Sequence, residues 1–78
     1  MIDKVFEYVK YEYEYAKDTL EKNYSWCTPS EIICNAETRA FGAVSFANHI
    51  QHDLFSKLES TWEIWRKKFE SLYDEINT

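Results

Sequence analysis

The chain has 78 residues, of which 45% are hydrophobic and 29% are charged, and its formal net charge is -5 at pH 7. A chain of this length is predicted to form one small domain, residues 1–78, with a single core. Its hydrophobic content is too high for a disordered chain. One glycine and one proline are too few for the turns of a sandwich or barrel, and the acidic balance argues against a nucleic-acid-binding protein, which needs cations to neutralise phosphates.

Residues 2–23 are predicted to form the first helix. Apolar and aromatic side chains recur there at steps of three and four residues, the spacing of one helix face, at Ile2, Phe6, Val9, Tyr13, Ala16 and Leu20. Tyr8, Tyr11 and Tyr15 fall beside this stripe and widen it. Charged pairs four residues apart largely cancel along the segment, so packing must hold this helix in place.

The second helix is predicted over residues 29–51. Thr28-Pro29-Ser30-Glu31 matches a capping box, in which the Thr28 side chain accepts a hydrogen bond from the Glu31 amide and Pro29 takes the first helical position. Cys27 and Ile32 occupy the positions of a hydrophobic staple across this boundary. The sequence therefore predicts a sharp helix start after Thr28.

The second helix is also predicted to be the central one. Residues 23–52 hold three formal charges, whereas residues 1–22 and 53–78 hold ten each. One side is a seam of mostly small residues at helical spacing, and another side carries larger ones, so we expect neighbours to cover more than half of its circumference. We interpret Gly42 as marking a close contact with a neighbouring helix or a bend in this one. The seam comprises Ile33, Ala36, Ala40, Ala43, Ala47 and Ile50, and the larger residues are Ile32, Phe41, Val44 and Phe46.

The third helix is predicted over residues 53–76, with Asp53 as its N-cap. Its apolar positions follow an unbroken heptad pattern, at Phe55, Leu58, Trp62, Trp65, Phe69, Leu72 and Ile76. No glycine or proline separates this helix from the second one, so a loop and a kinked continuous helix both remain open. A second capping box at residues 60–63 would interrupt the heptads if it were used.

Together these patterns predict a compact all-α domain of three helices, with the low-charge helix between the other two. We expect the core to be formed by the inward positions of all three helices. They are Phe6, Val9, Leu20, Ile33, Ala36, Ala40, Val44, Ala47, Leu58, Trp62, Trp65, Phe69 and Leu72.

The chain is predicted to be cytoplasmic. Its first residues are charged and periodic, unlike a secretory signal. The most apolar stretch, residues 32–50, is interrupted by Asn35, Glu37, Arg39, Asn48 and His49, which a bilayer would penalise, so we expect no membrane association. Two cysteines in a chain without an export signal indicate reduced thiols.

Four residues of the middle segment have side chains that bind metals: Cys27, Cys34, His49 and His52. Their spacing lies outside the usual separations of compact zinc sites, so we favour structural roles and predict no metal and no cofactor. A metal- or thiol-responsive regulator that uses these four residues is the alternative function. No phosphate-binding loop, nucleophile elbow or metalloprotease helix occurs, so we do not expect an enzyme.

The unusual feature of the composition is its aromatic content. Six Tyr, five Phe and three Trp make up 18% of the chain, more than three helices of about 30 Å each can enclose. We expect the surplus rings to form an interaction surface, with Tyr8, Tyr11, Tyr15, Trp26 and Tyr73 as candidates. The alternative is an aromatic core with ordinary exposed tyrosines.

The function predicted from these features is a non-catalytic protein-interaction module. We expect a protein partner or a second copy of the chain, bound through the aromatic flank of the first helix or the heptad face of the third.

Three segments of the chain also carry a family resemblance. They are Phe-Glu-Tyr-Val-Lys-Tyr-Glu-Tyr-Glu-Tyr-Ala-Lys at residues 6–17, Tyr-Ser-Trp-Cys-Thr-Pro-Ser-Glu at 24–31 and Arg-Ala-Phe-Gly-Ala-Val at 39–44. Across residues 6–44 the chain resembles small uncharacterised proteins encoded on conjugative transposons of Gram-positive bacteria. The resemblance implies an accessory protein of a mobile element, and it implies no activity, cofactor or catalytic residue.

Overall fold

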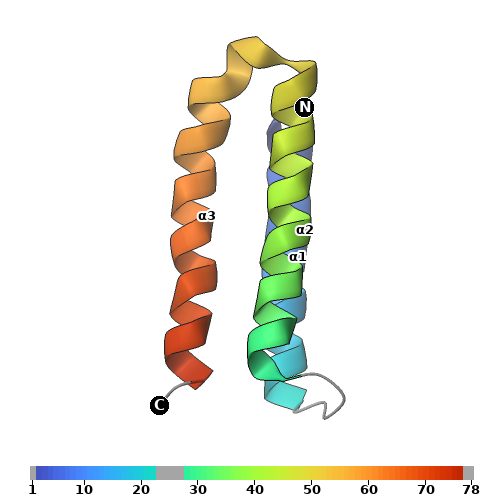
Figure 1. Cartoon of the computed structure of the whole chain (residues 1–78). Helices are drawn as coiled ribbons and strands as arrows, with labels where there is room; N and C mark the ends of the chain where they lie inside the picture. The colour runs from blue at the N-terminus through green and yellow to red at the C-terminus, as the bar shows by residue number, and fades with distance from the viewer. Residues whose placement is uncertain (1, 23–27, 77–78) are drawn as a thin grey trace.

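A computed structural model of the chain describes residues 2–22 and 28–76. They form three helices, α1 (Ile2–Lys22), α2 (Pro29–Ile50) and α3 (Phe55–Ile76), with a single 3₁₀ turn, η1 (His52–Leu54), before α3. Successive helices run in opposite directions (Figure 1), and α2 packs against both of the others, which contact each other less. The prediction of an all-α domain with three helices and a central second helix is confirmed.

The start of α2 is the one that the capping box predicts. Thr28 has extended backbone angles, and its hydroxyl oxygen accepts a hydrogen bond of 3.2 Å from the backbone N–H of Glu31. Pro29 occupies the first turn, where helical N–H groups have no partner within the helix. The predicted staple residue Cys27 lies outside the described residues.

The junction between α2 and α3 is a tight turn. The backbone N–H of Gln51 donates to the carbonyl of Ala47, and Gln51 then leaves the helical conformation with φ -129° and ψ 83°. After the 3₁₀ turn the chain runs back along α2 (Figure 1), so α2 and α3 are separate helices and not one kinked helix. Asp53 lies inside this turn, and the helix continues without a break through residues 60–63.

The core lies between the three helices and follows the predicted stripes. Phe69 of α3 reaches α1, where its ring meets the Tyr13 ring edge to face with centroids 5.6 Å apart. Three residues predicted for the core, Phe6, Leu20 and Trp65, are only partly buried and pack against its edge. The buried apolar side chains are Val9, Ala16, Ile33, Ala36, Ala40, Val44, Ala47, Leu58, Trp62, Phe69 and Leu72.

The covering of α2 is less complete than predicted. Phe41, Phe46 and Ile50 are 51%, 65% and 50% exposed, although we expected neighbours to cover the sides that carry them. The physical reason is geometric, because two neighbouring helices cover only part of the circumference of a third. The side chains that α1 and α3 do not reach remain in contact with water.

The prediction of a close contact at Gly42 is wrong, because a Cβ atom built there would meet nothing within 4 Å. The helix α2 also continues through Gly42 without interruption.

None of the helices in residues 2–22 and 28–76 combines the length and the apolar character that crossing a membrane requires.

Candidate interaction surfaces

Three of the predicted interaction residues lie together on α1. Tyr8, Tyr11 and Tyr15 are 39%, 61% and 50% exposed. Successive rings stack with centroids 6.4 Å apart and planes inclined by 22°. Lys4, Asp18 and Lys22 continue the same side of the helix, because the steps from Lys4 to Lys22 are 4, 3, 4, 3 and 4 residues. Helix α1 therefore carries a second heptad stripe that faces outwards.

Helix α2 extends this surface beside α1. Arg39 of α2 contacts Glu12 of α1, which places the Arg39 side of α2 next to the tyrosines. Phe46 follows Arg39 by seven residues, or two helical turns, and Ile50 follows Phe46 by one turn. These two side chains are also among the most exposed apolar residues. We call this surface the α1/α2 face; it comprises Tyr8, Tyr11, Tyr15, Arg39, Phe46 and Ile50.

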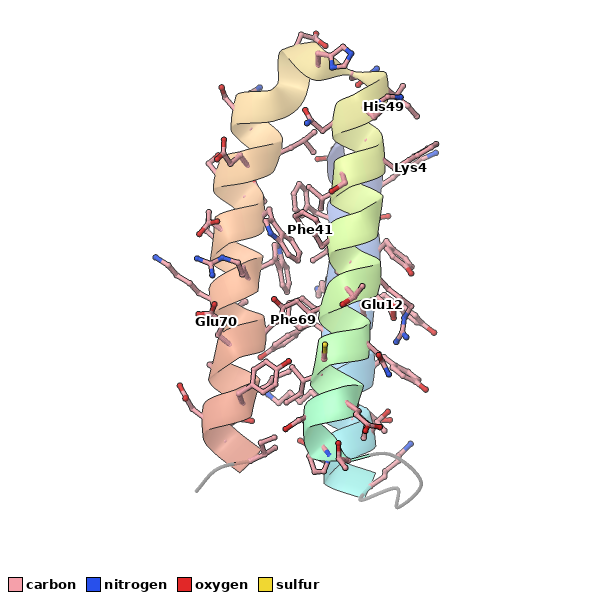
Figure 2. All side chains as sticks on the ribbon, viewed as in Figure 1. Lys4, Glu12, Phe41, His49, Phe69 and Glu70 are labelled. Carbon is pink, nitrogen blue, oxygen red and sulfur yellow. The ribbon has the colours of Figure 1, made fainter. Side chains whose placement is uncertain are left out.

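An ion pair beneath the tyrosines joins the two helices. The Glu12 carboxylate is only 3% exposed and accepts hydrogen bonds from Nε of Arg39 and, at 3.2 Å, from the hydroxyl of Tyr8. Burial and then the neighbouring Glu12 raise the pKa of the Tyr8 hydroxyl, and the hydrogen bond to Glu12 raises the pKa of Arg39. Figure 2 shows Glu12 beside α2, on the side of α2 away from α3. The pair fixes one edge of the tyrosine stripe relative to α2.

Sequence reasoning missed Glu12, although a signal was present. Glu12 falls three residues after Val9 and four before Ala16, which puts a carboxylate on the buried stripe. A buried carboxylate needs a partner, and Arg39 is the one lysine or arginine of the low-charge segment 23–52. The combination of these two outliers would have predicted the contact between α1 and α2.

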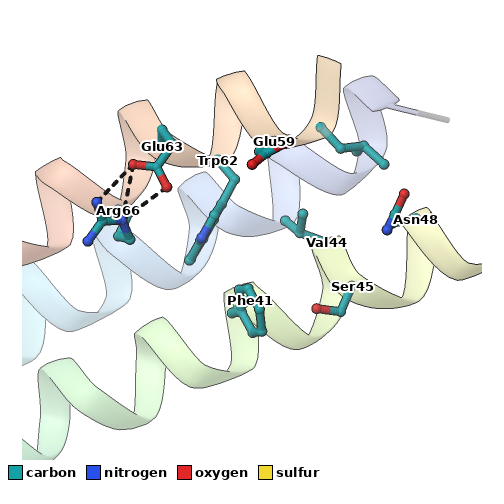
Figure 3. Close-up of a pocket in the computed structure, with 9 residues that line it drawn as sticks. Phe41, Val44, Ser45, Asn48, Glu59, Trp62, Glu63 and Arg66 are labelled. Carbon is teal, nitrogen blue, oxygen red and sulfur yellow. Dashed lines mark hydrogen bonds and ion pairs between the residues drawn. The ribbon is translucent and has the colours of Figure 1, made fainter. Parts of the chain in front are cut away.

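The second surface is a groove between α2 and α3. Two adjoining hollows of about 370 and 430 Å³ share Phe41, Trp62 and Arg66 as walls. The Phe41 and Trp62 rings approach each other from the two helices, with centroids 5.6 Å apart (Figure 3). We call this surface the α2/α3 groove; its other lining residues are Cys34, Glu37, Thr38, Val44, Ser45 and Asn48 of α2 and Leu58, Glu59, Glu63 and Tyr73 of α3.

Carboxylates dominate the charge around this groove. Arg66 donates to Glu63 at 2.8 Å and to Glu70 at 2.7 Å, and this pairing lowers the pKa of Glu63. Glu37 faces them from α2, and partial burial and then the negative charge of Glu70 raise the pKa of the Glu37 carboxyl. Among the described lining residues, the carboxylates of Glu37, Glu59 and Glu63 outnumber the one guanidinium of Arg66; Glu70 adjoins the groove, and the positive charge of Lys67 acts on Glu63 beside it. The groove therefore has a negative potential.

The two remaining candidate residues do not belong to the α1/α2 face. Tyr73 is half-buried and lines the α2/α3 groove beside the exposed thiol of Cys34. Burial and then the Cys34 thiol raise the pKa of the Tyr73 hydroxyl. Trp26 lies outside the described residues. The heptad face of α3, our other predicted contact surface, is largely buried in the core through Leu58, Phe69 and Leu72.

Asn48 is a half-buried residue with the one shielded side-chain oxygen or nitrogen of the described residues that has no hydrogen-bond partner. Its Oδ1 atom is shielded from solvent and accepts no hydrogen bond. The residue lines the groove near the end of α2 that leads into the turn (Figure 3). An unpaired buried oxygen of this kind costs about 1 to 3 kcal/mol, so Asn48 weakens the wall of the groove.

The predicted alternative of a single metal site cannot use all four candidate residues. Cys34 and His49 are both in α2, fifteen residues apart, which is a distance of about 22 Å along the helix axis. The rings of His49 and His52 are near each other, with centroids 6.3 Å apart. Within residues 2–22 and 28–76, no three His, Cys, Asp or Glu side chains are grouped closely enough to hold an ion; Cys27 lies outside this part.

No family model matches the chain, and no curated protein or solved structure matches it.

Proposed function

We propose that the protein is a non-catalytic protein-interaction module that binds a second copy of itself through the α1/α2 face. The supporting observation is the position of the exposed large apolar side chains. Five of the seven on the described residues lie on this face, namely Tyr8, Tyr11, Tyr15, Phe46 and Ile50. Exposed apolar clusters of this kind are typical of protein interfaces, where tyrosine supplies contact area and a polar tip.

The charge of the face supports a second copy as the partner. The Glu12–Arg39 pair is neutral as a unit, and Asp18 is paired with Lys22 at 3.0 Å. Lys4 adds one positive charge on the same side of α1. The α1/α2 face is thus close to neutral in a chain whose net charge is -5. Two such faces can meet around a two-fold axis with little repulsion, as in most homodimers.

Sedimentation equilibrium over a wide concentration range tests this proposal. We expect a monomer–dimer equilibrium that the double substitution Tyr11→Ser/Phe46→Ser weakens by about tenfold or more, because buried aromatic side chains dominate such interfaces. Both residues are mostly exposed, so circular dichroism should show an unchanged fold. Ile64→Ser, on an exposed position of α3, is the matched control.

Two outcomes would overturn the proposal: a chain that stays monomeric at millimolar concentration, or a double variant that associates as strongly as the wild type. A cytoplasmic location and an accessory role in a mobile element belong to the same proposal and rest on the sequence alone.

A further inference from the structure

A second binding site, on the other side of α2, is independent of self-association. We propose that the α2/α3 groove binds a basic amphipathic helix of a different protein. The proposal rests on three properties of the groove: its length, its apolar floor and its charge.

The groove has the dimensions of a helix-binding site. Its lining residues on α2 run from Cys34 to Asn48, fourteen residues or about 21 Å along the axis. On α3 they run antiparallel to these, from Leu58 to Tyr73. A pair of antiparallel helices with an open boundary is where a further helix packs in a bundle. A partner helix of about four turns would fill this length.

The floor of the groove is apolar at its centre. Phe41 is half-exposed although it belongs to the central helix, and the mostly buried Trp62 forms the opposite wall. A partner helix with apolar residues at positions i, i+3 or i+4, and i+7 would cover these rings, the usual way in which an amphipathic helix binds a groove. The chain itself provides no segment that covers Phe41 in the part that the structure describes.

The charge of the groove selects the kind of partner. Three carboxylates, Glu37, Glu59 and Glu63, line the groove and Glu70 adjoins it, whereas its one lining guanidinium is already bonded to Glu63 and Glu70. Lysine or arginine on both flanks of the partner helix would meet Glu37 on one side and Glu59 on the other. A second copy of the chain is a poor occupant, because it also carries a net charge of -5.

Three synthetic helical peptides of four turns provide the test. The first has a leucine stripe with lysine flanks, the second has the same stripe with glutamate flanks, and the third has lysine flanks with an alanine stripe. We expect the first to bind the full chain at least about tenfold more tightly than either of the others, since binding needs both the apolar contact and the charge. Amide chemical shifts in NMR spectra should change at Phe41, Asn48 and Trp62.

Two variants of the chain locate the site. Phe41→Ser should weaken binding of the first peptide by about tenfold, and Glu37→Gln/Glu59→Gln should weaken it by about fivefold, most strongly at low salt. The matched control Glu7→Gln/Glu21→Gln removes the same charge from exposed positions of α1 and should leave the affinity nearly unchanged. Thermal unfolding of each variant verifies the fold.

Several results would overturn the inference. The first is equal affinity for the first and second peptides, which differ in their flanks, or for the first and third, which differ in their stripes. The others are that no peptide binds, or that the amide chemical shifts change only on the α1/α2 face. The Tyr11→Ser/Phe46→Ser variant separates the two proposals, because it should lose self-association and keep full affinity for the first peptide. If it loses both, the groove is not an independent site.

Discussion

The two interfaces of the central helix differ in the size of the side chains that form them. Towards α1, the α2 residues next to Arg39 on the same side are alanines, Ala36 one turn before it and Ala43 one turn after it. Towards α3, Phe41 of α2 meets the ring of Trp62 with centroids 5.6 Å apart, and Trp62 in turn packs against Phe69 of its own helix with centroids 6.3 Å apart. Small side chains allow close approach of two helices, whereas rings hold them apart.

This difference explains why the two surfaces are of different kinds. Helix α1 packs closely on α2, and the hollow between them, of about 380 Å³, lies at the outer edge and is lined by Tyr8, Tyr11, Glu12, Tyr15 and Arg39. Binding there therefore uses the outer edges of both helices, the tyrosines and Phe46. The wider spacing of α2 and α3 leaves the groove, with an apolar centre and acidic margins. One helix thus supplies part of the α1/α2 face on one side and part of the α2/α3 groove on the other.

The largest effect is expected at the ion pair between α1 and α2. Arg39→Leu would leave the almost fully buried Glu12 carboxylate with only the Tyr8 hydroxyl as a partner. We expect it to lower the free energy of unfolding by about 3 kcal/mol. The double substitution Glu12→Leu/Arg39→Leu should restore stability to within about 1 kcal/mol of the wild type. Urea denaturation measures both values, and a single variant as stable as the wild type would contradict the burial of a charged Glu12.

A pair of leucine substitutions compares the two interfaces directly. Ala40 is fully buried, so Ala40→Leu should overpack the core at α2 and cost about 2 kcal/mol. Ser45 lines the groove, so Ser45→Leu should change stability by less than about 0.5 kcal/mol. Thermal unfolding of the two variants checks the contrast, and equal losses would mean that both sides of α2 are equally tight.

The unpaired Oδ1 atom of Asn48 predicts a substitution that raises stability, whereas the preceding ones lower it. Leucine has a branched shape similar to that of asparagine and no polar atoms to leave unsatisfied. We expect Asn48→Leu to raise the free energy of unfolding by about 1 kcal/mol. The measurement is again urea denaturation, with Asn35→Leu at an exposed position of α2 as the control. A loss of stability would show that the Asn48 amide makes a hydrogen bond after all.

The smallest effect concerns the pH dependence of stability. Burial and Glu70 raise the pKa of Glu37 in the folded chain above its ordinary value of 4.5. The folded state therefore binds this proton more tightly than the unfolded state. The stabilisation from this group is complete below pH 4.5 and is lost as the pH rises through the raised pKa.

Glu37→Gln removes this titration. We therefore expect the variant to become more stable relative to the wild type as the pH rises from about 4 to 7, by a few tenths of a kcal/mol at most for this half-exposed group. Glu7→Gln, at an exposed position of α1, serves as the control for removal of a negative charge. Parallel pH profiles for Glu37→Gln and the wild type would refute the raised pKa of Glu37.

Most of the fold could be predicted from local patterns. The heptad positions from Leu58 to Leu72 and the capping box at Thr28 depend only on neighbouring residues, and the structure has both. The end of α2 at Ile50 was less predictable, because the turn there contains neither glycine nor proline. Asp53 has the chemistry of an N-cap but lies within the 3₁₀ turn instead.

The interaction surfaces could be predicted only in part. The tyrosines of α1 were found because they fall outside the core stripe of their own helix. The exposure of Phe41 and Phe46 was not found, because periodicity identifies an apolar side of α2 but not the directions from which α1 and α3 approach it. The same limit applies to Tyr73, whose neighbour Cys34 is far away in the sequence.

The Glu12–Arg39 pair also determines how far α1 can slide along α2. A seam of alanines repeats every three or four residues, so a displaced α1 would find a similar row of small side chains two turns away. In that arrangement Glu12 would lie against Ile32 or Phe46, which precede and follow Arg39 by seven residues, and its charge would be stranded beside a hydrocarbon or a ring. Glu12, the one buried carboxylate of residues 2–22 and 28–76, therefore favours one longitudinal alignment of the two helices over otherwise equivalent ones.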